Sequence, residues 1–250
     1  VSRIFTRVEG GQALSRGFEF TKTTGGAAQE YFWFMKMAGI DEIDVTTFTS
    51  NLNRPEALAA LTAMVEIAEA NAVDLPSIPN GFSDRKIAMA RQHPGLMRRS
   101  IEQNPDLMDE YDIFLPRMSP DSPPVAHAFV NGVAILEASQ NKDLAWKFIA
   151  YLYEEENLME LERISGYFAG RTDLVEHQME IHPKIELFYN LFPYMQSTVL
   201  PPPRNTAQTE LGDLILRVYR REMPPQEALI HAHQTWTRLL AEWENEIVVR

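Results

Sequence analysis

Histidine is the side chain in this sequence best suited to metal binding or proton transfer, and the chain has six of them. Two histidines on one helix face must lie three or four residues apart to bind one ion. His231 and His233 are two residues apart in a predicted helix, and His177 and His182 are five apart. The chain also lacks cysteine, which excludes disulfides, thiolate catalysis and cysteine-bound zinc. We therefore expect no metal site and no cofactor.

Carboxylates are the other candidate for chemistry, since a pair of them can hydrolyse a glycoside. The chain carries 35 acidic residues, some of them in runs such as Glu154–Glu156. No spacing marks two of these acids as converging, and such a run is typical of a solvated face. Nucleophile elbows, phosphate-binding loops and dinucleotide fingerprints are absent from the sequence as well. We expect no catalytic residue.

Aromatic rings and loop arginines could instead hold a ligand without transforming it. Tyr31 and Trp33 lie in an aromatic run, and either ring could stack on a sugar, although most of that run fits a buried helix face. Arg171 and Arg204 each lie in a loop beside glycine or proline. An arginine held in such a loop is a frequent polar contact in pockets, and it is also a common surface charge.

The elements that must position these residues are mostly helices. Apolar residues at helical spacing and capping residues predict helices at 27–38, from 53 to about 73, at 96–102, from 141 to 165, at 208–221 and from 223 onward. In the helix that begins at Asn141, the predicted buried face consists of Leu144, Ala145, Phe148, Ile149 and Leu152. Alternation and apolar runs predict strands at 17–21, 111–116 and 127–136. The pattern is therefore α/β, with helices in excess.

One stretch, "NGFSDRKIAMARQHPG" at 80–95, has a mixed character. A polar turn leads into Ile87–Met89, which we expect to be a short buried segment. The stretch then ends at His93–Gly95, which we expect to be an abrupt turn; such a turn can simply end an element, or it can hold backbone and side chains against a ligand.

Charge limits the partners. The net charge of −12 disfavours a nucleic-acid groove, because phosphate binding needs clustered lysine and arginine. It disfavours docking on an anionic membrane for the same reason. No apolar run approaches the length of a membrane span. The chain opens at Val1 without methionine or a signal-peptide pattern, so we expect that a leader was removed or that the sequence is a piece of a longer chain.

Four blocks carry a resemblance to a known family. They are "FSDRKIAMARQHPG" (82–95), "FVNGVAILEASQNKDLAWKFIAYL" (129–152), "GYFAGRTDL" (166–174) and "PPQEALIHAHQTW" (224–236). In this order they resemble the extracellular solute-binding proteins of ABC importers, in the carbohydrate-binding group that includes maltose-binding protein. The similarity extends from about residue 17 to residue 236. In one place the chain departs from the family: many sugar binders carry a Gly-Trp pair where this sequence has His93–Gly95.

The resemblance implies a helix-rich periplasmic-binding-protein-like fold with two lobes. Residues 1–126 would form the first part of the C-terminal lobe, 127–184 would return to the N-terminal lobe, and 185–250 would supply the closing helices of the C-terminal lobe. The start of the N-terminal lobe has no counterpart here, so the resemblance implies a partial chain. The proline-rich stretch at 119–124 falls at one expected crossing between lobes.

The resemblance also implies a function. The protein would capture a small solute, a sugar or oligosaccharide, by hinge closure and deliver it to the transmembrane subunits of an ABC permease. It would act as a monomer in the periplasm or outside the cell, with a lipid anchor as one form of attachment. The matching blocks and the loop arginines give the ligand contacts as Trp33, His93, Asn131, Phe168, Arg171 and Arg204. Two alternatives stay open: a carbohydrate-active enzyme with an unmarked carboxylate pair, and a non-catalytic helical interaction module.

Overall fold

The computed structural model describes residues 2–129, 131–181, 184–201 and 204–248. The chain forms two compact units. Unit 1 contains residues 1–91, 114–128 and 194–250, and unit 2 contains residues 92–113 and 129–193. These boundaries fall after residues 91, 113, 128 and 193, whereas the sequence predicts lobe boundaries after 126 and 184. The assignment of the chain to two lobes stays a prediction.

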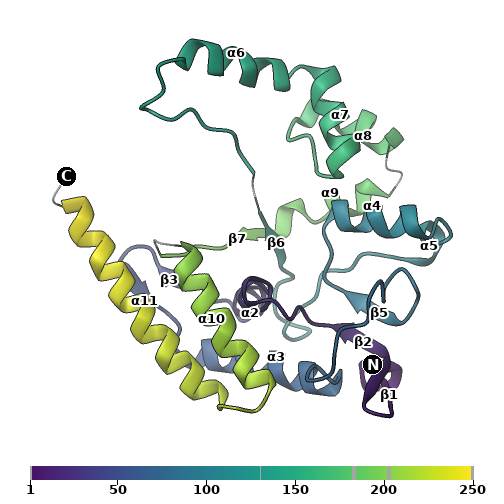
Figure 1. Ribbon diagram of the computed structural model, residues 1–250, viewed down its shortest axis with the longest axis vertical. Coiled ribbons are helices and arrows are strands. Elements are labelled where there is room, and N and C mark those ends of the chain that lie inside the picture. The colour runs from purple at the N-terminus through teal and green to yellow at the C-terminus, as the bar shows by residue number, and fades with distance from the viewer. Residues whose placement is uncertain (1, 130, 182–183, 202–203, 249–250) are drawn as a thin grey trace. The chain divides into compact units, whose positions relative to one another are not determined.

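Unit 1 is a helical layer packed beside short sheets (Figure 1). Its elements are α1 (Ser2–Phe5), β1 (Arg7–Glu9), β2 (Gln12–Glu19), α2 (Thr24–Met37), β3 (Ile43–Asp44), β4 (Thr49–Ser50), α3 (Pro55–Ala70), β5 (Ile87–Ala90), β6 (Ala126–Ala128), β7 (Met195–Ser197), α10 (Arg204–Tyr219) and α11 (Pro225–Val248). The helices α2, α3, α10 and α11 enclose a core that includes Tyr31, Phe32, Leu61, Ile215 and Trp236, all with no exposed surface. The predicted helices at 27–38, 53–73, 208–221 and 223 onward are confirmed.

The central helix α2 follows from its local sequence. The Thr23 hydroxyl caps it by accepting a hydrogen bond from the backbone N–H of Gly26 at 3.2 Å. Its aromatic run is buried, as predicted for most of that run, and Trp33 alone of the four rings at 31–34 is only half-buried. Beyond the helix, Gly39 has a φ of +76°, a conformation that glycine adopts without strain.

A glycine permits the closest helix contact of unit 1. Gly212 in α10 lies against the first turn of α2, where a Cβ atom at position 212 would be 1.8 Å from the carbonyl oxygen of Thr24. The side chain of Gln208, one turn earlier, donates a hydrogen bond to the carbonyl oxygen of Gly25 at 2.9 Å. α2 and α10 therefore pack backbone to backbone at this point.

The main sheet has the strand order β1-β2-β5. β2 and β5 run parallel, with Arg16 opposite Ile87 and Phe18 opposite Met89. The predicted strand at 17–21 is thus confirmed in part as β2. The segment at 87–89, predicted to be buried, belongs to the strand β5, in which Ile87 is buried, Met89 is half-buried and Ala88 is exposed. His93–Gly95 is not a terminating turn: it begins helix α4, because Pro94 occupies the first helical position and His93 caps it. β6 and β7 form a second parallel pair, with His127 opposite Gln196.

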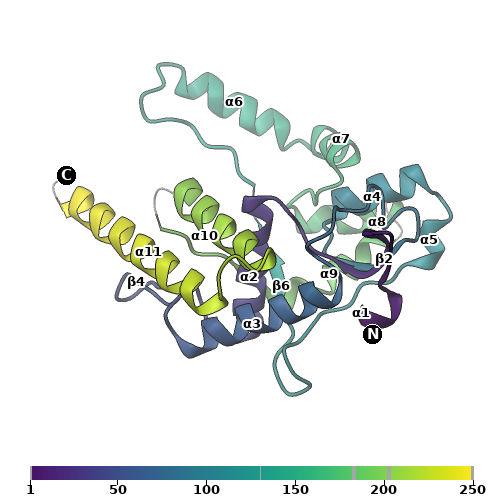
Figure 2. The same ribbon diagram turned by 60° about the horizontal axis from the view of Figure 1, so that its bottom comes forward.

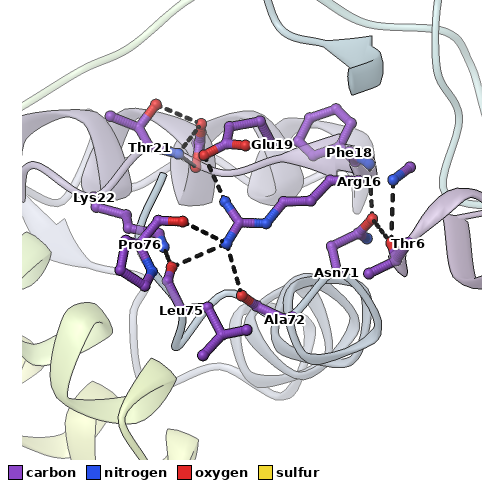
Figure 3. A network of polar contacts seen from close by, with 12 residues as sticks. Thr6, Arg16, Phe18, Glu19, Thr21, Lys22, Asn71, Ala72, Leu75 and Pro76 are labelled. Atoms are coloured by element: carbon purple, nitrogen blue, oxygen red, sulfur yellow. Dashed lines mark hydrogen bonds and ion pairs between the residues drawn. The ribbon is translucent and has the colours of Figure 1, made fainter. Parts of the chain in front are cut away.

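One buried arginine ties the main sheet to the end of α3 (Figure 3). The Arg16 guanidinium donates hydrogen bonds to the carbonyl oxygens of Ala72, Leu75 and Pro76 at 2.9–3.0 Å, and it forms an ion pair with Glu19 at 2.7 Å. Only 2% of Arg16 is exposed. These carbonyls belong to the chain that leaves a helix C-terminus, where unpaired acceptors gather and a cation is favoured.

Asn71 makes a second link at the same place. Its amide oxygen accepts hydrogen bonds from the backbone N–H of Phe18 at 2.7 Å and from the Thr6 hydroxyl at 3.1 Å (Figure 3). β2 is therefore anchored to the end of α3 by hydrogen bonds at Arg16 and at Phe18.

Unit 2 is helical. Its elements are α4 (Pro94–Gln103), α5 (Leu107–Glu110), α6 (Lys142–Leu152), α7 (Glu155–Ser165), η1 (Thr172–Leu174), α8 (Val175–Ile181), α9 (Ile185–Tyr189) and η2 (Phe192–Tyr194). Its buried apolar cluster is small and consists of Leu158, Met159, Ala169 and Leu174. α4 meets the end of α7 closely: the Arg98 guanidinium donates to the carbonyl oxygens of Arg163 and Ile164, and Gly166 ends α7 with a φ of +72°.

Two strand predictions are wrong. Residues 111–116 form no strand, because α5 occupies 107–110 and the Tyr111 carbonyl accepts a hydrogen bond from the Lys184 ammonium at 2.8 Å. The strand predicted at 127–136 is limited to β6, since its partner β7 is three residues long. Asn131–Leu136 belongs to no strand of the described structure, and residue 130 lies outside the described residues.

The burial predicted for α6 is also wrong. The helix predicted from 141 to 165 forms as two helices, α6 and α7, with a break at Tyr153 and Glu154, and no residue of α6 is buried. Leu144 is 67% exposed and Phe148 is 58% exposed, although both belong to the predicted buried face. Within unit 2, no described side chain packs closely enough on this face to bury it.

No helix in the described parts of the chain combines the length and the apolar character that a bilayer crossing requires.

Candidate functional site

Unit 1 gathers polar and aromatic side chains around β6. Trp33 reaches this place from α2, and its indole N–H donates a hydrogen bond to the carbonyl oxygen of Val125 at 3.2 Å, one residue before β6. His127 lies on β6, and Arg91 follows the end of β5. Arg204 is the first residue of α10 and is exposed. We call Trp33, Arg91, His127, Thr198 and Arg204 the β6 cluster.

His127 is held as a neutral imidazole. Its Nε2 atom shares a hydrogen bond with the hydroxyl of Thr198, which directly follows β7. Burial, together with the nearby cations of Arg91, Lys36 and Arg204, lowers the pKa of His127 to about 3. A neutral imidazole can donate one hydrogen bond and accept another, so it suits an uncharged hydroxyl-bearing ligand.

The charges beside His127 are balanced by buried carboxylates. Glu30 is 2% exposed and accepts hydrogen bonds from the backbone N–H of Thr21 at 2.9 Å and from the Thr21 hydroxyl at 2.7 Å. Burial raises the pKa of Glu30 to about 7, while the Arg91 cation opposes that rise. Because this carboxyl is bound into the core of unit 1, it is poorly placed to meet a substrate.

Lys36 and Glu42 form the second buried pair, 3.1 Å apart. Glu42 also accepts a hydrogen bond from the backbone N–H of Val199 at 3.3 Å, which fixes the chain just beyond Thr198. Burial raises the pKa of Glu42, and the Lys36 charge counteracts this. The Lys36 charge is thus held inside unit 1, whereas the Arg204 charge is exposed at the surface.

The other four predicted site residues lie in unit 2, and two of them, His93 and Phe168, contact other aromatic rings there. The His93 ring stacks on Tyr167, with 5.2 Å between centroids and 18° between planes, and its Nδ1 accepts a hydrogen bond from the backbone N–H of Leu96 at 3.3 Å. Phe168, next to Tyr167, packs against the rings of Tyr189 and Phe192 at 5.0 and 5.2 Å. We call His93, Tyr167 and Phe168 the unit 2 aromatic group.

Arg171 and Asn131 lie outside this group. The Arg171 guanidinium pairs with the Asp173 carboxylate and donates to the Tyr153 carbonyl oxygen at 3.1 Å, so it fixes the turn before η1. Asn131 is exposed in the segment that precedes α6.

Sequence reasoning missed Arg91, His127 and Tyr167. A usable signal existed for two of them, because ligand sites of parallel sheets lie at the carboxyl ends of the strands. Arg91 directly follows β5, and Thr198, the partner of His127, directly follows β7. This rule can be applied only when the pairing of β6 with β7 is known. The two strands are almost seventy residues apart, and no sequence motif indicates that they pair.

A metal site and a surface hollow are two other kinds of candidate site. Over the described residues, no cluster of three or more histidine, aspartate or glutamate side chains could hold a metal ion, and His182 lies outside those residues. A hollow of about 600 Å³ beside α7 is lined by charged residues including Glu155, Glu160 and His177. It contains none of the predicted site residues and lies apart from the aromatic rings named above.

The chain resembles solved structures in fold. An ABC-transporter solute-binding protein from Agrobacterium radiobacter K84, in complex with ribitol, matches with a TM-score of 0.75 and 18% identity over 95% of this chain and 62% of that one. Maltose-bound MalE3 of T. maritima matches with a TM-score of 0.74 and 16% identity over 89% of this chain and 60% of that one. The sugar-binding protein MalE of Xanthomonas citri matches with a TM-score of 0.73 and 15% identity over 93% and 60%.

By sequence, no family model and no curated protein matches the chain. The chain spans about three-fifths of the length of the solved structures it resembles. The predicted fold class is confirmed, since these structures are solute-binding proteins and the match extends over nine-tenths of this chain. The chain therefore has the helix-rich α/β fold of the ABC-transporter solute-binding proteins and covers part of that fold.

Proposed function

We propose that this chain is the larger part of a non-catalytic solute-binding protein that captures a small sugar or polyol for an ABC importer. The observation that carries the proposal is the fold shared with complexes of ribitol, maltose and tagatose. The β6 cluster supports it, because an indole ring beside a neutral imidazole and an exposed guanidinium suits an uncharged polyhydroxyl ligand.

Within the β6 cluster each residue has a proposed role. The half-buried Trp33 ring offers one face for stacking, while its N–H holds it on the Val125 carbonyl. His127 and Arg204 would hydrogen-bond hydroxyl groups, and the Thr198 hydroxyl fixes the imidazole. His93, Asn131, Phe168 and Arg171 remain proposed contacts through the family resemblance.

Capture would be coupled to closure of a hinge, because a ligand shifts an equilibrium only by its differential affinity for the two states. The partner would be the permease of an ABC importer, and the protein would act as a monomer in the periplasm or outside the cell. Buried carboxylates such as Glu30 are held by core hydrogen bonds, which favours binding over hydrolysis.

The test is isothermal titration calorimetry on the complete gene product with ribitol, tagatose, maltose and mannobiose. We expect saturable binding of at least one of them and no new product by chromatography. Arg204→Gln should weaken binding about tenfold or more, the size of one charged hydrogen bond. The matched control is Arg217→Gln in the last turn of the same helix, which should leave affinity unchanged. Absence of heat with every sugar and polyol, or turnover of maltose, would overturn the proposal.

A further inference from the structure

Three polar side chains lie together in unit 2, one from each of the helices α7, α8 and α9 (Figure 2). Glu162 of α7 is 2% exposed, and Gln178 of α8 has no exposed surface. The hydroxyl of Tyr189, in α9, donates a hydrogen bond to the side-chain oxygen of Gln178. We call Glu162, Gln178 and Tyr189 the unit 2 polar triad. It joins three helices by polar contacts, in a unit whose buried apolar cluster is small.

The Glu162 carboxyl is the poorly satisfied member of the triad. Among the described residues, neither of its oxygens has a hydrogen bond of good geometry, and the Gln178 Nε2 atom has none either. Burial raises the pKa of Glu162 to about 7, although the adjacent Gln178 amide opposes that rise. A buried carboxyl with so few donors favours the neutral acid, because its charge would be left without compensation. Glu162 is therefore protonated below neutral pH and charged above it.

The charged groups on the elements around Glu162 have other partners or are exposed. On its own helix, Arg163 forms an ion pair with Glu160 at 2.7 Å. On α8, the His177 ring lies 3.8 Å from Glu155. Two other cations donate to backbone carbonyl oxygens, Arg98 and Lys184. The carboxylates of α8 and α9 are exposed: Glu176, Glu180 and Glu186. The pKa of Glu162 is therefore set by burial and by the Gln178 amide.

Tyr189 connects the polar triad to the unit 2 aromatic group. The centre of its ring lies 5.0 Å from that of Phe168 and 4.9 Å from that of Phe192. Phe168 and Phe192 in turn pack edge to face at 5.2 Å. Because aromatic rings pack in preferred relative orientations, a movement of the Tyr189 ring changes the position of Phe168. Phe168 is the ring of this group that is proposed above as a ligand contact.

We propose that Glu162 acts through the other two members of the triad as a positioning residue for Phe168. While the carboxyl is protonated, the Tyr189 hydroxyl stays on the Gln178 oxygen, as the structure has it. Once ionised, the carboxylate is a stronger acceptor than the amide oxygen and draws the hydroxyl toward itself. The two groups are within electrostatic reach, since burial and the Glu162 charge together raise the pKa of Tyr189 to about 12. The Tyr189 ring then moves, and Phe168 moves with it.

The consequence for solute capture rests on the function proposed above. The Phe168 ring contributes stacking area to a ligand only while it is held in place, so affinity should fall as the pH rises through 7. His127 stays neutral in this range and adds nothing to the change. The pKa of Glu30 in unit 1 is also about 7, so variants must separate its effect from that of Glu162.

Nuclear magnetic resonance of the complete gene product tests the positioning without any ligand. With ring-labelled phenylalanine, the signal of Phe168, assigned with Phe168→Leu, should shift in one step with a midpoint at about pH 7. Glu162→Gln supplies a neutral group of the same shape and should hold the signal at its low-pH position throughout. Glu160→Gln, exposed on the same helix, is the matched control and should keep the step. Absence of a step in the native protein, or a step that survives Glu162→Gln, overturns the proposal.

Two further variants decide the matter even if Glu162→Gln does not fold. Tyr189→Phe removes only the hydroxyl, so Phe168 should no longer follow the Glu162 carboxyl, whose own titration is measured from its carbon-13 signal. His177→Gln removes the histidine next to Gln178 and should leave the step unchanged, although histidine also changes charge near neutral pH. A step that survives Tyr189→Phe, or one that disappears with His177→Gln, overturns the proposed route.

Calorimetry at pH 6 and pH 8 tests the effect on capture, with whichever of ribitol, tagatose, maltose and mannobiose binds. The dissociation constant at pH 8 should be at least about threefold larger than at pH 6. Glu162→Gln should remove this ratio, and Glu30→Gln should preserve it. Equal constants at the two pH values, or a ratio that vanishes with Glu30→Gln alone, overturn the link to affinity. If none of the four compounds binds, the proposed function fails, and the Phe168 signal still decides the role of Glu162.

Discussion

The Glu30 carboxylate accepts hydrogen bonds from both the backbone N–H and the hydroxyl of Thr21, at 2.9 and 2.7 Å. This contact joins the end of β2 to the middle of α2 in the core of unit 1. It holds a carboxyl in a place where ionisation is unfavourable, since burial raises the pKa of Glu30 to about 7. The contact therefore makes the stability of unit 1 depend on pH.

Glu30→Gln should reduce that dependence. The pKa of Glu30 is higher in the folded chain than in the unfolded chain, so between about pH 4.5 and 7 the unfolded state releases its proton first. The contribution of Glu30 to stability is full below pH 4.5 and falls by up to about 3 kcal/mol as the pH rises through 7. Relative to the wild-type chain, Glu30→Gln should be more stable at pH 8 than at pH 5, as measured by the free energy of urea unfolding. The exposed Glu66→Gln is the control, and equal shifts in both variants would contradict the prediction.

Arg16→Met should destabilise unit 1 by about 3 kcal/mol or more. The substitution leaves the Pro76 carbonyl oxygen and the Glu19 carboxylate without their Arg16 donor in a buried place, and it removes one of two donors from the carbonyl oxygens of Ala72 and Leu75. Urea unfolding followed by tryptophan fluorescence measures the loss. Arg7→Met, on the exposed strand β1, should change stability by less than about 0.5 kcal/mol. A small loss at Arg16 would show that water replaces the guanidinium at the end of α3.

Gly212→Ala should destabilise the chain, although alanine in a helix interior is normally better than glycine by about 0.5–1 kcal/mol. A Cβ atom at this position would lie 1.8 Å from the Thr24 carbonyl oxygen, so α2 and α10 must separate. We expect a loss of about 2 kcal/mol in thermal unfolding. Asp213→Ala, one residue on and exposed, serves as the comparison. A stabilising Gly212→Ala would mean that the two helices do not approach so closely.

His127 should stay neutral between pH 5 and 8. Its pKa is lowered to about 3, so its neutral form stabilises the fold above pH 6.5 and that stabilisation is lost as the pH falls toward 3. Nitrogen-15 NMR of the labelled imidazole should show one unchanging neutral tautomer across pH 5–8. Sugar affinity should therefore be independent of this residue's charge in that range. A titration of His127 near pH 6.5 would contradict the burial of this imidazole.

The helices of unit 1 could be predicted because their signals are local. Thr23 and Pro55 mark helix starts, and the apolar spacing of α2, α3, α10 and α11 fixes the faces that become the core. The exposure of α6 could not be predicted in the same way. Its sequence specifies an apolar helix, whereas its exposure depends on which other segments are present to cover it.

The residues of the candidate site were harder to predict from the sequence than the fold was. Trp33 could be singled out because one ring of a buried aromatic run must lie toward the edge of the core. His127 could not, because its partner Thr198 comes from a strand almost seventy residues later. The strand predicted at 111–116 failed for a related reason: Lys184, a distant residue, holds the Tyr111 carbonyl and lies 4.4 Å from the centre of its ring.

The parallel pairing of β6 with β7 has a consequence for the unfolded state of unit 2. Ala128 lies opposite Ser197, so the two strands bring together the two ends of the segment 129–193. While unit 1 stays folded, that segment can unfold only as a closed loop, which has less chain entropy than a free segment of the same length. The β6–β7 pair thus restrains the ends of this segment as a cross-link would. If the two strands separate, the segment should gain more chain entropy when unit 2 unfolds.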